Sequence, residues 1–211
     1  MDDNGFLANR RAVMSLFCEP DEVVGHALRI VLAEKDISVE IEFLEESEMP
    51  DDLKALNPYG TLPLLVDREL VVYDGQIALE YLDERFPHPP MMPVDPVQRV
   101  VNRQLRLRIE RDLYPLVRQI RGDDEVAAAA ARKAMRDNLT AIAPAFEQTP
   151  FFMSEEYTLA DAALAPVLWR LKGLGVKLPP SARPLIKYAI SLFKREAFRA
   201  SLSPAEKAYV Q

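Results

Sequence analysis

The sequence is poor in cysteine, histidine and glycine, with one, two and seven of these among its 211 residues. A single cysteine has no partner, so Cys18 forms no internal disulfide, and we expect a reducing, cytoplasmic location. One cysteine and two histidines are too few for a structural zinc site of the usual kind. We therefore expect neither a metal nor another cofactor.

Long apolar runs are missing as well. No stretch approaches the roughly 18 consecutive apolar residues of a membrane-spanning helix, so we expect no contact with a membrane. The first residues, MDDNGFLANRR, lack the apolar segment of a secretory signal, and we expect no signal peptide.

Basic residues are too few to balance the acidic ones. The chain has 26 Lys and Arg against 33 Asp and Glu, which gives a net charge of −7. Phosphate backbones repel an acidic protein, so direct, sequence-specific binding of nucleic acid is not expected, although action through a protein partner stays open. The hydrophobic fraction of 49% is sufficient for a packed core in one or two domains.

Strand and helix patterns alternate in the first 86 residues, and only helices follow. The predicted order is strand 13–17, helix 23–35, strand 37–44, short helix 49–56, strands 62–66 and 69–73, and helix 75–86. The later helices are predicted at 97–120, 125–146, 159–171 and 185–198. We thus predict an α/β domain over residues 10–87, a proline-rich linker over 88–96 and an all-helical domain over 97–211.

The linker region, FPHPPMMPVDP, contains five prolines in eleven residues. Proline fixes the backbone, so a stiff connector between domains is one interpretation. His88, held between Pro87 and Pro89, has little conformational freedom to lose, so a partner that binds it gives up little entropy. A recognition surface is therefore the second interpretation, and Met91 and Met92 either extend it or fill the gap between the domains.

Three short stretches resemble the glutathione transferase superfamily. NPYGTLP at 57–63 resembles the loop before that family's cis-proline, which would be Pro63, and YLDERFP at 81–87 resembles the end of its third helix. TLAD at 158–161 resembles the capping box of its buried helix, a motif in which Thr158 and Asp161 bond reciprocally. The resemblance implies a thioredoxin-like N-terminal domain, a helical glutathione-transferase-type C-terminal domain, and a homodimer.

The resemblance also implies positions of a glutathione site, which we expect to be vestigial. They are Cys18, Leu62, Pro63, Asp74 and Gly75. Three carboxylates lie within four residues after Cys18, and their charge raises the pKa of a thiol. Gly75 replaces the serine hydroxyl that the family offers to glutathione. No catalytic residue is therefore predicted, with a glutathione-dependent transferase or thiol reductase using Cys18 as the alternative.

The strings ALRIVLAEK, EYLDERFPHPPMMPV and LAPVLWRL resemble, more specifically, a bacterial RNA-polymerase-associated branch of the superfamily. This resemblance implies a regulator of transcription in starvation or stress. It would dock without covalent chemistry onto RNA polymerase holoenzyme and its housekeeping sigma factor. Pro87, His88 and Pro89 would form the partner-binding patch.

Arginines recur along the first helix of the helical domain. Arg99, Arg103 and Arg106 follow helical spacing, and acidic residues are interleaved further along. A salt-bridged, solvated face is favoured over a surface for an acidic partner or nucleic acid, and some of these arginines are candidates for a dimer surface. His26 has no partner that the sequence identifies and is predicted to be structural.

Overall fold

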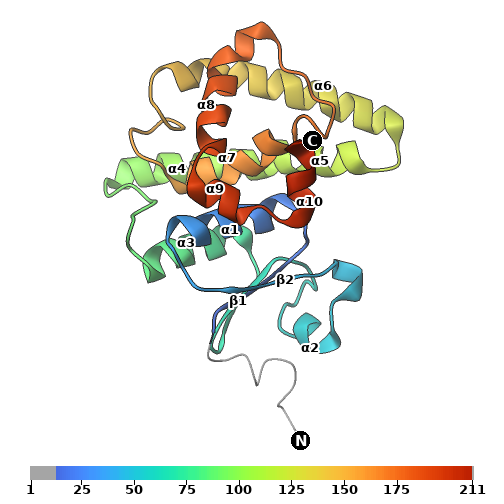
Figure 1. Cartoon of the computed structure of the whole chain (residues 1–211), viewed down its shortest axis with the longest axis vertical. Helices are drawn as coiled ribbons and strands as arrows, with labels where there is room; N and C mark the ends of the chain where they lie inside the picture. Colours follow the sequence, from blue (N-terminus) through green and yellow to red (C-terminus); the bar gives the residue numbers. More distant parts are fainter. Residues whose placement is uncertain (1–12, 211) are drawn as a thin grey trace, which may run out of the picture.

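The N-terminal half folds around a four-stranded sheet (Figure 1). The computed structural model describes residues 13–210, so the first three residues of the predicted domain lie outside them. The strands are β1 (Ser15–Cys18), β2 (Glu40–Phe43), β3 (Leu64–Asp67) and β4 (Leu70–Val72), in the order β2-β1-β3-β4. β1 is parallel to β2 and antiparallel to β3, which is antiparallel to β4. The thioredoxin-like α/β prediction is confirmed.

Helices cover both faces of this sheet. α1 (Val23–Glu34) and α3 (Gly75–Arg85) lie between the sheet and the helical half, and α2 (Asp51–Lys54) lies on the opposite side (Figure 1). Successive side chains of a strand point to opposite faces, so Phe17 packs with Leu53 of α2 while Leu16 packs with α1. Both faces are therefore apolar, as in a sheet buried between two layers.

The C-terminal half is helical, as predicted. Its helices are α4 (Pro96–Arg108), α5 (Tyr114–Arg121), α6 (Glu125–Ile142), α7 (Leu159–Arg170), α8 (Arg183–Phe193), α9 (Glu196–Ser201) and α10 (Pro204–Lys207). A π-helical segment, Ile109–Leu113, joins α4 to α5 into one continuous stretch. α7 is almost wholly buried and begins with the predicted capping box, in which Asp161 accepts from the Thr158 N–H at 2.8 Å.

The predicted single helix over 185–198 is wrong, because the chain breaks between α8 and α9. Arg195 has an extended backbone there (φ −62°, ψ 139°). Its guanidinium binds the Glu34 carboxylate of α1 through two contacts of 2.6 and 2.7 Å. An ion pair between the domains thus lies at this bend, which local helix propensity does not encode.

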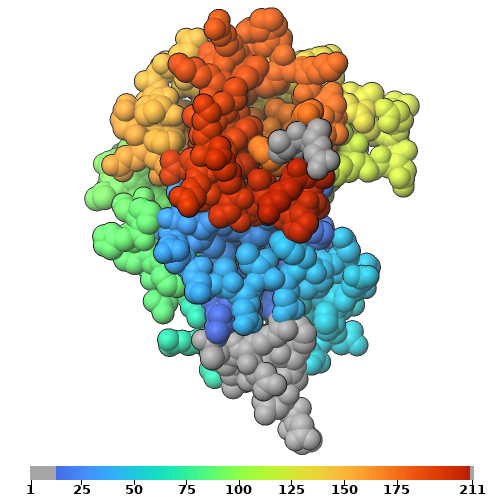
Figure 2. Space-filling view, viewed as in Figure 1, coloured from blue at the N-terminus to red at the C-terminus, as the bar shows by residue number. Residues whose placement is uncertain are grey.

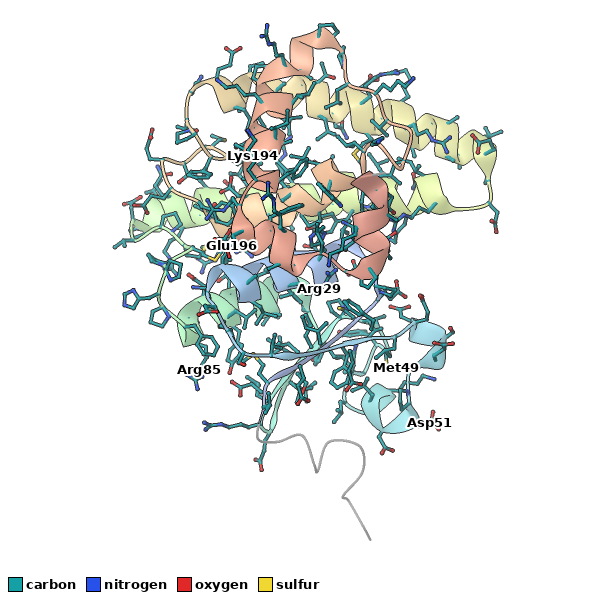
Figure 3. The ribbon with its side chains drawn as sticks, in the orientation of Figure 1. Arg29, Met49, Asp51, Arg85, Lys194 and Glu196 are labelled. Carbon is teal, nitrogen blue, oxygen red and sulfur yellow. The ribbon has the colours of Figure 1, made fainter. Side chains whose placement is uncertain are left out.

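Buried charges join the two halves. Arg29 on α1 donates to both carboxylate oxygens of Glu206 on α10, at 2.9 and 2.8 Å, and Arg170 on α7 binds the same carboxylate. Figure 3 shows Arg29 on α1, below the C-terminal helices. His26 does have partners: its Nε2 lies 3.1 Å from Ser201 Oγ, and Arg170 approaches its Nδ1 at 3.0 Å. The predicted structural role of His26 agrees with this position.

Within residues 13–210, no helix is long and apolar enough to cross a bilayer.

Candidate functional site: the linker and the region around Cys18

The Pro-His-Pro turn is exposed on the surface between α3 and α4. Pro87, His88 and Pro89 are all exposed, and the bond between His88 and Pro89 is cis. Met91 and Met92 are only 2% and 6% exposed and pack into the core that joins both halves. Of the two alternatives for these methionines, they fill the gap between the domains and do not extend the exposed patch.

A buried lysine holds this turn from below. Lys35 Nζ donates to Asp83 Oδ1 at 2.8 Å and to the carbonyl oxygens of Phe86 and Pro89 at 2.7 Å each. The same Asp83 oxygen accepts from the Met91 N–H at 2.8 Å. One ammonium group therefore fixes both ends of the turn. The sequence shows Lys35 only as the polar end of a helix, so no local signal points to this role.

Cys18 lies at the end of β1, where the family places its thiol or hydroxyl. It is fully buried, and burial raises the pKa of its thiol to about 12. Nearby Arg29 opposes this rise, while the charges of Glu22 and Glu206 add to it. The predicted direction agrees, but desolvation is the main cause, ahead of the carboxylates on the following loop. A neutral, enclosed thiol is a poor nucleophile.

The N-terminus of α1 is occupied by the chain itself. The Glu22 carboxylate caps this helix by accepting from the Val24 and Gly25 N–H groups at 2.8 and 2.6 Å. These amide groups are the donors that would otherwise favour an anion at a helix start. An incoming thiolate would therefore meet a carboxylate instead of free donors.

The loop before β3 has the expected geometry but an internal partner. The Leu62–Pro63 peptide bond is cis, as the resemblance implied. The Leu62 N–H, which would pair with an extended peptide, instead donates to Glu46 Oε1 at 3.1 Å. A ligand would have to displace this side chain.

The start of α3 leaves no space for a larger side chain at position 75. Asp74 caps the helix through its Oδ1, which accepts from the Ile77 N–H at 2.9 Å. A Cβ atom built on Gly75 would lie 2.1 Å from Val24 Cγ1, so a serine does not fit without movement of α1. Glycine thus permits close packing of the two helices at a position where the resemblance implied a site for glutathione.

A cleft of about 330 Å³ remains between the loop after β1 and α5. Its lining mixes acidic Glu19, Glu22 and Glu110 with basic Arg118 and Arg121. Desolvation by burial raises the pKa of all three carboxyl groups. In the part of the chain that the structure describes, His, Cys, Asp and Glu form no cluster of three that could hold a metal ion.

The arginines of α4 are paired with α3. Arg103 binds Glu80 at 2.8 Å, Arg106 contacts the same carboxylate, and Arg99 lies 3.9 Å from Glu84. The predicted salt bridges are present, although the partners lie on α3 and not on α4 itself. The predicted solvated face is wrong for Arg106, which is only 2% exposed because it packs under α3. A groove of about 590 Å³ runs along this α3–α4 face.

Comparison with known proteins points to one family. The model of the glutathione S-transferase N-terminal domain matches residues 24–85, and that of the C-terminal domain matches residues 125–203. Two similar proteins are the stringent starvation protein A homologs of Pasteurella multocida and Coxiella burnetii. The first is 47% identical over 92% of each chain, and the second is 43% identical over 93% of this chain and 95% of its own.

A solved structure shares the fold. The glutathione transferase of Methylococcus capsulatus superimposes with a TM-score of 0.81 over 93% of this chain and all of its own. At 24% identity this likeness extends to architecture and not to activity.

Proposed function

The chain belongs to the stringent starvation protein A family within the glutathione transferase superfamily, and from this membership we propose a transcription regulator without catalytic activity. It acts in starvation or stress, in the cytoplasm, by docking onto RNA polymerase holoenzyme and its housekeeping sigma factor. Pro87, His88 and Pro89 form the contact patch.

One observation carries this proposal: the exposed turn is anchored at both ends by hydrogen bonds from a buried lysine. Lys35 contacts Asp83, Phe86 and Pro89, and the two following methionines are buried beneath the turn. A preorganised surface loses little entropy on binding, which favours recognition. The hydrogen bonds from Lys35 hold the backbone on both sides of His88, and this supports the use of the turn as a recognition surface.

The former glutathione site supports the absence of catalysis. A bound tripeptide would use three features that the chain itself occupies. Glu22 accepts from the N–H groups at the start of α1, and Glu46 accepts from the Leu62 N–H. Val24 fills the space beside Gly75. The thiol of Cys18 stays protonated near neutral pH because its pKa is raised to about 12. One feature favours the alternative, a transferase or thiol reductase: the cis bond before Pro63 is retained.

A homodimer formed through the α3–α4 face is part of the proposal. Ile77, Val100 and Leu107 are exposed apolar residues on these helices, at 62%, 52% and 44%. Exposed apolar residues beside a groove and paired charges suit a self-complementary interface. Each dimer would present the Pro-His-Pro turn twice.

The test is capture of RNA polymerase holoenzyme by the purified, immobilised chain. A variant with alanine at Pro87, His88 and Pro89 should lose at least about tenfold in captured polymerase, because the anchors of an interface carry most of its affinity. Val94→Ala is the control, since Val94 is 93% exposed in the same linker. Full capture by the folded triple variant would overturn the docking assignment.

A conjugation assay with glutathione and an electrophilic chlorodinitrobenzene addresses the alternative. We expect no rate above the uncatalysed reaction. Turnover that disappears in Cys18→Ser would show that the thiol is catalytic and would replace the proposal with the enzyme.

A further inference from the structure

The last fifth of the chain has a charge opposite to that of the whole. Residues 171–211 contain eight Lys or Arg and only two Asp or Glu, whereas the whole chain contains 26 and 33. One of the two acids, Glu206, is buried and bound to Arg29 and Arg170. Figure 2 shows this segment, coloured orange to red, across the centre of one face of the helical half. A basic surface on an acidic protein is a candidate for an anionic partner.

An apolar groove lies within this basic segment, between α8 and the end of α7. Its volume is about 520 Å³, and Trp169, Leu178, Ile186, Ile190 and Phe193 are among the residues that line it. Ile186 and Ile190 are 38% and 49% exposed. Large exposed apolar residues gathered around a hollow mark interaction sites more often than singly scattered ones do.

The spacing of these residues defines the shape of an occupant. Ile186, Ile190 and Phe193 follow positions i, i+4 and i+7 of α8, so they form a second apolar stripe beside the one that faces the core. Leu185, Tyr188 and Leu192 form the core stripe and are buried. The groove stripe extends over two turns, roughly 10 Å, which is the length along which another helix makes contact.

Lysines set the charge at the edge of the groove. Lys172 and Lys177 are among its lining residues, and Lys194 follows Phe193 at the end of α8, where Figure 3 labels it. All three are exposed. Carboxylates that flank a docked apolar ridge would fall within a Debye length, about 8 Å, of these ammonium groups.

We propose that the groove between α7 and α8 docks an acidic amphipathic helix of a partner protein. An apolar ridge fills the hollow against Ile186, Ile190 and Trp169, and glutamates or aspartates beside the ridge pair with the lysines. A flat anionic bilayer would reach the rim but not the recessed floor. A nucleic acid would use the lysines and leave the apolar floor uncovered. The site lies apart from the Pro-His-Pro turn and does not depend on its role.

The experiment measures binding of two fluorescein-labelled 18-residue peptides to the full-length chain by fluorescence anisotropy. The first has leucines at i, i+4, i+7 and i+11, with glutamate and alanine elsewhere; the second replaces each glutamate by lysine. We expect the acidic peptide to bind at least about tenfold more tightly than the basic one, and more weakly as salt rises.

Variants locate the binding on the protein. Ile190→Glu should weaken the acidic peptide about tenfold or more, and Lys172→Glu combined with Lys177→Glu should do so several-fold. Val126→Glu on α6 is the control, because Val126 is 83% exposed and lies outside the groove. Unfolding midpoints in urea show that each variant is folded.

Several results would overturn the proposal. One is that the two peptides bind equally tightly. Another is that neither peptide binds at concentrations up to about 1 mM, a range that covers weak docking. A third is that the Ile190→Glu variant binds the acidic peptide as tightly as the wild type does. Stronger binding to phosphatidylglycerol vesicles than to the peptide would assign the groove to a membrane. Loss of self-association in sedimentation by Ile190→Glu, but not by Val126→Glu, would assign it to a second copy of the chain.

Discussion

The Nζ atom of Lys35 lies 2.8 Å from Asp83 Oδ1, and both groups are buried under the exposed turn that joins the two halves. Removal of one partner of a buried ion pair leaves an uncompensated charge, which is strongly destabilising. Lys35→Met should therefore lower the free energy of unfolding by about 3 kcal/mol or more, measured by urea denaturation. Lys133→Met, which breaks an exposed pair with Asp137, should leave the midpoint unchanged. Equal unfolding midpoints for the two variants would contradict a stabilising role for the Lys35–Asp83 pair.

Cys18 should be nearly inert in the folded protein. With its pKa raised to about 12, only about one thiol in ten thousand is ionised at pH 8, against about a quarter of free cysteines. We expect reaction with a disulfide reagent to be at least about a hundredfold slower in the native chain than in urea. Absorbance of the released thiolate measures both rates. A native rate near the unfolded one would show an accessible, ionised thiol.

Gly75→Ser should destabilise the protein although serine is the better helix former. The new Cβ would lie 2.1 Å from Val24 Cγ1, and overpacking of this kind costs about 1–3 kcal/mol. A double variant, Gly75→Ser with Val24→Ala, should recover most of this loss, and Val24→Ala alone is the control. Urea denaturation measures all three. If Gly75→Ser alone were as stable as the wild type, α1 and α3 would have to separate easily to make room for the new side chain.

Acid should weaken the fold through His26. Burial, aided by the charges of Arg170 and Arg29, holds the pKa of His26 well below its usual 6.5. Below pH 6.5 the unfolded chain therefore binds a proton that the folded chain excludes, and stability falls as pH falls, by at most about 1.4 kcal/mol per pH unit. The slope of the free energy of unfolding against pH, between pH 7.5 and 5.5, should therefore lose this contribution in the His26→Asn variant.

The comparison of slopes isolates the histidine. Glu19, Glu22 and Glu110 have raised pKa values, and their opposite contribution is shared by both proteins. Identical slopes in wild type and variant would show that His26 accepts a proton in the folded state, for example through Glu206, which lies 3.3 Å from its Nδ1.

The sequence predicted most of the fold because the signals were local. Alternation of apolar residues located the strands, and Pro63 marked the start of one of them because proline cannot donate to a sheet. The capping-box motif formed by Thr158 and Asp161 predicted the start of the buried helix. The break at Arg195 was missed, since no glycine or proline marks it and the carboxylate that Arg195 contacts there belongs to Glu34, far away in the chain.

The site was predicted in part. The positions of the turn and of the cis-proline followed from short motifs. The roles of Lys35 and Glu206 could not be predicted in this way, because charged residues usually lie at the surface. Their partners are far away in the sequence: Asp83 is 48 residues from Lys35, and Arg29 is 177 residues from Glu206. Glu22 was recognised as a charge near Cys18, but its role as the cap of α1 depends on where its carboxylate points.

The carboxylate of Glu206 neutralises two arginines that belong to earlier helices, so the compensation of both buried charges depends on α10. A nascent chain emerges from the ribosome with α1 and α7 first, so Arg29 and Arg170 have no buried counterion in common until residue 206 follows. The thioredoxin-like half by itself therefore leaves the buried guanidinium of Arg29 without this counterion, and the charge is compensated only when α10 is in place.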